Sequence, residues 1–179
     1  MKGQKQKTLS ALSRDLPDEA EIAQLLDLIM LESDRGCALV AGALLEAGLL
    51  TAIMSRLVAV TPAERKAWTD TSDAPLSTFS QKIKIARGLG ILGPATERTL
   101  SRVKDIRNAF AHALRPLNFS NPTIVSACQG LVVAKMPKLS DTGVPPARVR
   151  YASVCVGHFA LLLADATANG GKEMTVNLP

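Results

Sequence analysis

Apolar residues recur at spacings of three and four along most of this chain, which is the periodicity of helices that bury one face. The sequence Thr61-Pro62-Ala63-Glu64 combines a capping box with proline at the first helical position, and Asn121-Pro122 marks another helix start. After Pro17 the pattern predicts either one long helix with a polar band at 32–36 or two helices that meet there. Helix starts are expected near Pro17, Pro62, Leu76, Pro94, Pro122 and Val149, and the helix from Pro94 should end near Ala113.

Composition agrees with an all-α single-domain bundle of about six to eight helices. Hydrophobic residues make up 47% of the 179 residues and aromatics only 3%, so the core must be built from Leu, Ala, Val and Ile. We expect a flexible basic tail over 1–15, a single helical domain over 16–170 and a loose C-terminal tail over 171–179.

The segment from Gly36 to Met54 is long and apolar enough to cross a bilayer, but Glu46 lies in its middle. It is therefore interpreted as a buried core helix, with no membrane contact. Three cysteines are far apart and odd in number, and the N-terminus has no apolar run of the kind a secretory signal needs. A cytoplasmic location follows, and no cofactor or metal site is predicted.

The formal charge of +5 would assist contact with a polyanion. A candidate basic surface lies between residues 82 and 104, although a solvated helix face explains the same charges because no aromatics are interleaved to stack bases. No clear DNA-binding motif is present. The residues of this candidate surface are Lys82, Lys84, Arg87, Arg98, Arg102 and Lys104.

Arg107 and His112 are the strongest candidates for chemistry. Five residues rotate a helix by about 140° relative to the starting side chain, so the two do not share a face as an i,i+4 pair would. They could meet across a homodimer, where two antiparallel copies of the helix would line one cleft with a cation for phosphate and an imidazole for proton transfer. That arrangement suits metal-independent RNA cleavage.

The segment Arg107-Asn108-Ala109-Phe110-Ala111-His112 resembles the Arg-x(4–6)-His motif of HEPN domains, many of which are dimeric ribonucleases. Three blocks together resemble the MltR family, named for the mannitol operon repressor. These blocks are Glu32 to Gly36, Leu76 to Ala86 and Ile106 to His112. The resemblance implies a helical, HEPN-related protein that acts on the expression of a carbohydrate operon.

A polar cluster formed by Glu32, Asp34, Arg35, Arg107 and Asn108 has three interpretations. It could consist of ion pairs that hold helices in register, it could be a binding site, or Arg107 and His112 could be catalytic. The leading hypothesis, which the resemblance implies, is an MltR-like transcriptional regulator that represses a carbohydrate- or mannitol-utilisation operon and works as a homodimer through contacts with a protein or a nucleic acid. The alternatives are a HEPN-type ribonuclease or toxin and a structural adaptor.

Overall fold

The protein, as a computed structural model, is described for residues 16–57, 61–132 and 145–169. Within these ranges it has seven α-helices and no strand, which confirms the all-α prediction. The tails expected at 1–15 and 171–179 lie outside the described residues. The helices are α2 (Glu19–Leu31), α3 (Asp34–Met54), α4 (Pro62–Thr69), α5 (Phe79–Gly88), α6 (Pro94–His112), α7 (Pro122–Gln129) and α8 (Pro146–Asn169).

Side-chain caps set where most of these helices begin. Asp18, Thr61 and Thr78 each form a reciprocal capping box with the residue three positions later, and Ser33 accepts a hydrogen bond from the backbone of Gly36. A cap of this kind satisfies an amide that has no acceptor within the helix. The Ser33 cap decides the question left open by the sequence, because it makes the polar band at 32–36 a boundary between two helices.

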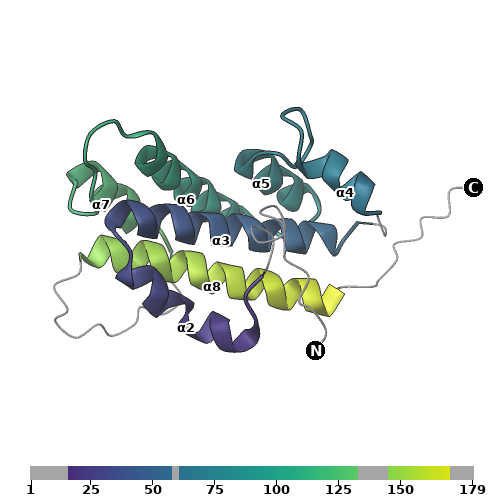
Figure 1. The fold of residues 1–179 in the computed structure, drawn as a ribbon, viewed down its shortest axis with the longest axis horizontal. Helices are drawn as coiled ribbons and strands as arrows, with labels where there is room; N and C mark the ends of the chain where they lie inside the picture. Colours follow the sequence, from purple (N-terminus) through teal and green to yellow (C-terminus); the bar gives the residue numbers. More distant parts are fainter. Residues whose placement is uncertain (1–15, 58–60, 133–144, 170–179) are drawn as a thin grey trace, which may run out of the picture.

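The centre of the fold is the pair α3 and α8, which lie side by side along their length (Figure 1) and form the most extensive helix–helix contact. Small residues on α3 permit the close approach. A Cβ atom at Gly48 would lie only 2.7 Å from Cδ2 of Phe159 on α8. Glycine therefore lets the phenyl ring rest directly on the α3 backbone.

The other helices cover this pair from two sides. α2 packs against α8 and α3 on one side, whereas α5 and α6 pack on the opposite side of α3 (Figure 1). Helix α7 packs on α8 and on α6, and α4 lies next to α5. Between α3, α6 and α8 three aromatic rings contact one another in tilted pairs, with centroids 4.7 Å apart for Phe110 and Phe119 and 5.6 Å apart for Phe119 and Tyr151. The buried Tyr151 hydroxyl donates to the carbonyl of Ala38 at 2.9 Å.

Both central helices are long and apolar enough to cross a membrane by length and composition alone. In α3, however, nine of the 21 residues are buried within the described bundle, as expected for the core helix predicted at 36–54. Helix α8 likewise buries one face, including Tyr151, Cys155 and Phe159.

Candidate functional site

A pocket of about 340 Å³ lies where the N-terminal end of α5 meets α3 and α6. Helix α3 contributes one residue, the start of α5 four and α6 four. Eight of the nine side chains are polar, so the pocket is suited to a polar ligand. The lining residues are Glu46, Ser77, Thr78, Phe79, Ser80, Lys104, Arg107, Asn108 and His112.

Helix α6 supplies the nitrogen-bearing wall of this pocket. Lys104, Asn108 and His112 follow one another at intervals of four residues and so form one stripe along the helix, with Arg107 beside them. Arg107 and His112 thus reach the same pocket within one chain. From the sequence the two residues were expected to meet across a dimer, whereas in the structure both line this pocket of a single chain.

An ion-pair cluster closes the inner end of the pocket. Glu46 of α3 contacts Lys82 Nζ of α5 at 2.6 Å and Arg107 Nη2 of α6 at 3.2 Å, so one carboxylate ties three helices together. The side chains of Lys82 and Glu46 are only 9% and 16% exposed, whereas that of Arg107 is 31% exposed. Buried charges require partners, and here two cations share one anion, which leaves the cluster with an excess of positive charge.

The position of Arg107 depends on a glycine of α3. A Cβ at Gly42, one turn before Glu46, would lie 2.8 Å from Cγ of Arg107 and 3.1 Å from the Tyr151 hydroxyl. The missing side chain therefore leaves room for the arginine stem to cross α3. From there Arg107 Nη1 also donates to Oδ1 of Asn108 at 3.0 Å.

The α5 wall is built from a helix start. Thr78 caps the helix, and the Gln81 side chain accepts from the hydroxyls of Thr78 and Ser77 at 2.8 and 3.0 Å. Across the described ranges, the Ser80 hydroxyl and the His112 ring have no hydrogen-bond partner. The pocket therefore contains polar groups that the fold itself leaves available to a ligand.

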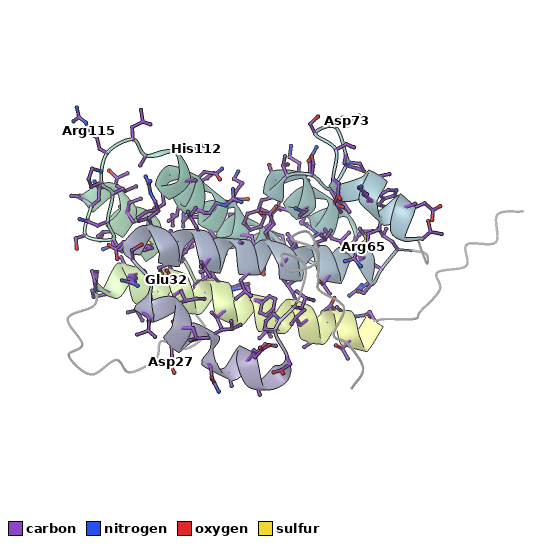
Figure 2. All side chains as sticks on the ribbon, viewed as in Figure 1. Asp27, Glu32, Arg65, Asp73, His112 and Arg115 are labelled. Atoms are coloured by element: carbon purple, nitrogen blue, oxygen red, sulfur yellow. The ribbon has the colours of Figure 1, made fainter. Side chains whose placement is uncertain are left out.

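The remaining residues of the predicted polar cluster lie elsewhere. Figure 2 places Glu32 at the junction of α2 and α3, away from His112 at the end of α6. Asp34 pairs with Arg148 of α8 at 3.1 Å and accepts from the backbone amide of Phe119 at 2.9 Å. A single cluster is therefore the wrong grouping: the structure joins Arg107 and Asn108 to the pocket and keeps Glu32 and Asp34 at the helix junction.

Arg148 organises that junction. It is 9% exposed and donates to the carbonyl oxygens of Ile29, Met30 and Glu32 at the C-terminal end of α2. A cation at this end of a helix satisfies orphan carbonyls and complements the helix dipole. The nearby Arg35 acts in the same way on α6, because it donates to the carbonyl of Ala113.

Comparisons with known proteins bear on the fold. No family model matches the sequence, and no curated protein matches it either. The structure is similar to a chain in the X-ray structure of the MtlR–HPr complex from Escherichia coli, with a TM-score of 0.58 and 16% sequence identity. The match covers 83% of this chain and 99% of that chain. The fold is MtlR-like.

Within this MtlR-like fold the candidate basic surface is not continuous. Lys82 is buried against Glu46, which corrects its assignment to a surface. Arg87 pairs with Glu97 at 3.4 Å, Arg102 donates to the carbonyl of Gly130, and Lys104 lines the pocket. Only Lys84 and Arg98 of the six are exposed and lack a partner among the described residues.

The cysteines are buried thiols in the core. Burial raises the pKa of Cys128 to about 12 and raises the pKa values of Cys37 and Cys155 as well. Such thiols are protonated at neutral pH and are poor nucleophiles. Among the described residues no group of three or more His, Cys, Asp or Glu side chains is arranged to hold a metal ion.

Several pocket residues were not among the candidates from sequence. Glu46 was noted from the sequence only as an acidic residue in the middle of an apolar segment, and Ser80 was not singled out. Two signals were available. The first is that Lys104, Asn108 and His112 are spaced four residues apart, which places them on one face of a helix. The second is that Thr78 and Gln81 have the spacing of a capping box, which marks a helix start.

Proposed function

We propose that this protein is an MltR-like regulator that controls expression of a carbohydrate-utilisation operon by binding a protein partner. The observation that carries the proposal is the MtlR-like fold, which extends over 99% of a chain from a complex with the protein HPr. The mannitol operon is the first candidate, because it is what the resemblance of the three sequence blocks implies. A cytoplasmic homodimer is part of the same proposal.

Two features of the described residues favour a binding protein over an enzyme. Both terminal nitrogens of Arg107 already donate within the chain, to Glu46 and to Asn108, so this arginine has a role in the architecture of the pocket. Four of the six residues of the candidate basic surface contact partners within the chain, which weakens the case for a continuous nucleic-acid surface. These features favour contact with a protein as the route to transcription control.

The test is a binding experiment with purified HPr from the same organism. Isothermal titration calorimetry should give saturable binding, and a basic protein of similar size should give none under the same salt. Transcripts of the mannitol operon should rise in a strain that lacks the gene and return to normal on complementation. Absence of both HPr binding and any transcript change would refute the regulator proposal.

A second candidate function is a HEPN-type ribonuclease, and one observation favours it: Arg107, His112 and Lys104 line the same pocket. In this scheme Arg107 orients the phosphate, His112 transfers protons and Asn108 positions the motif. Purified protein should then cleave a mixed RNA pool in the presence of chelator. His112→Ala should abolish cleavage, whereas Arg98→Ala, an exposed position on the same helix, should retain it. Intact RNA with the parent protein would eliminate this candidate.

A further inference from the structure

We propose that the pocket between α3, α5 and α6 is a binding site for a small phosphate ester. The inference goes beyond partner binding, because it assigns a ligand to the interior of the pocket. It rests on the charge of the lining, on hydrogen-bond donors without partners among the described residues and on the size of the pocket.

The charge of the lining is positive. Glu46 is the one carboxylate in the pocket, and Lys82 behind it already provides one compensating charge at 2.6 Å. Arg107 and Lys104 are then cations in excess at the pocket wall. Lys104 contacts Asp105 at 3.1 Å, but the Asp105 side chain is 71% exposed and its charge is screened by water. An anion that enters the pocket meets uncompensated positive charge.

Donors for phosphate oxygens are present beside these cations. Arg107 uses one hydrogen on each terminal nitrogen for Glu46 and Asn108, so the second hydrogen on each remains. Because Oδ1 of Asn108 accepts from Arg107, the amide nitrogen of Asn108 is left as a donor with no partner within the described chain. Ser80 adds a hydroxyl that has no partner in the part of the chain that the structure describes. Donors of this type, combined with a guanidinium, are what a phosphate group binds best.

Size and lining identify the rest of the ligand. A volume of about 340 Å³ lies at the lower end of the range for small-molecule sites, roughly 300–1,000 Å³. Phe79 is the one Phe, Tyr or Trp in the lining, whereas nucleic-acid grooves present successive aromatic platforms on which bases stack. Hydroxyl-bearing side chains from 77, 78 and 80 suit a hydroxylated body instead. The pocket therefore favours a small, non-aromatic phosphate ester over an oligonucleotide.

The experiment is a titration of the full-length protein with glucose 6-phosphate, inorganic phosphate and glucose, followed by calorimetry and by ¹H–¹⁵N NMR. Saturable binding of glucose 6-phosphate, with shifts at Ser80 and Asn108 and none caused by glucose, is the expected result. Lys104→Met should weaken that binding about tenfold, since a charge-assisted contact contributes roughly 1.5 kcal/mol. Ser80→Ala should weaken it by a smaller factor.

Arg98→Met is the matched control, because it removes one positive charge from an exposed position of the same helix that is not in the pocket. It should change the dissociation constant less than twofold. Equal effects of Lys104→Met and Arg98→Met would refute a defined site, as would no saturable binding of glucose 6-phosphate up to roughly 10 mM. Binding of a short RNA without binding of glucose 6-phosphate would also overturn the inference and would support the ribonuclease. HPr binding by the Lys104→Met variant tests the regulator proposal separately.

Discussion

The Glu46 cluster gives the sharpest test of how the bundle is held together. Replacement of Glu46 by leucine removes the one carboxylate that Lys82 contacts within the described ranges, while the Lys82 side chain stays 9% exposed. Arg107 loses the same partner but keeps Asn108 and is 31% exposed, so water compensates part of its charge. An uncompensated buried charge costs about 3–5 kcal/mol, and with one of the two cations partly solvated we expect about 3 kcal/mol.

The assay is urea unfolding followed by circular dichroism, with a thermal melt as a second measurement. A loss of about 3 kcal/mol corresponds to a decrease in melting temperature of about 6–12 °C for a chain of this size. The double variant Glu46→Leu/Lys82→Met removes the stranded ammonium and should recover more than half of the loss. Asp105→Asn is the control, because the 71% exposed Asp105 side chain should contribute less than about 0.5 kcal/mol.

Two results would refute this reasoning. If Glu46→Leu cost less than about 1 kcal/mol, Lys82 would have to reach water by a path that the packed structure does not provide. If the double variant were no more stable than the single one, the loss would come from the leucine side chain itself and the ion pairs would not be its cause.

Three further predictions follow from packing and burial. Gly48→Ala should destabilise the protein by about 1–3 kcal/mol in urea unfolding, because the new Cβ would clash with the Phe159 ring. The control Gly157→Ala, which has open space at its Cβ, should stabilise the protein by about 0.5–1 kcal/mol. Equal effects of the two substitutions would contradict the contact between Gly48 and Phe159. The pKa of Cys128 rises from 9.0 to about 12 in the fold, so its contribution to the free energy of unfolding is fully present below pH 9 and is lost as the pH rises towards 12. The Cys128 thiol should also react slowly with iodoacetamide at pH 8 in the native protein and rapidly in urea. Fast labelling of the native protein would show that the thiol is accessible. Arg148→Met should lower the free energy of unfolding by about 3 kcal/mol and should accelerate amide hydrogen exchange at the C-terminal end of α2 more than in α6. An equal acceleration in both helices would argue that Arg148 does not act as a local cap of α2.

The sequence predicts local structure well and tertiary partners poorly. The capping box at Thr61 and the proline starts at Pro94 and Pro122 correctly located α4, α6 and α7, because those signals depend on neighbouring residues alone. Helix α5 begins at Phe79, three residues after the apolar pattern starts at Leu76, because Thr78 provides the cap. Apolar periodicity alone could not locate that boundary.

Ion-pair partners depend on which helices pack together, and the spacing of charges does not contain that information. Asp34 pairs with Arg148, a residue 114 positions away. Lys82 was predicted to belong to a basic surface, whereas in the structure it pairs with Glu46 of α3. Conversely, Arg107 and His112 were identified from the motif itself. What the motif could not supply was the wall contributed by 77–80, which reaches the pocket only through the packing of α5 on α6.

The pairing of α3 with α8 also sets the order of events during translation. Met54 and Pro146, which bound the two helices, are separated by 92 residues, 146 minus 54, so at synthesis rates of about 5–20 residues per second the ribosome completes α3 roughly 5–20 s before α8 starts. During that interval α3 lacks the helix with which it makes its most extensive contact, although α2, α5 and α6 can already pack against its other faces. We therefore expect the nascent protein to depend on chaperones, and C-terminal truncations that remove α8 to aggregate even though α2 to α7 are intact.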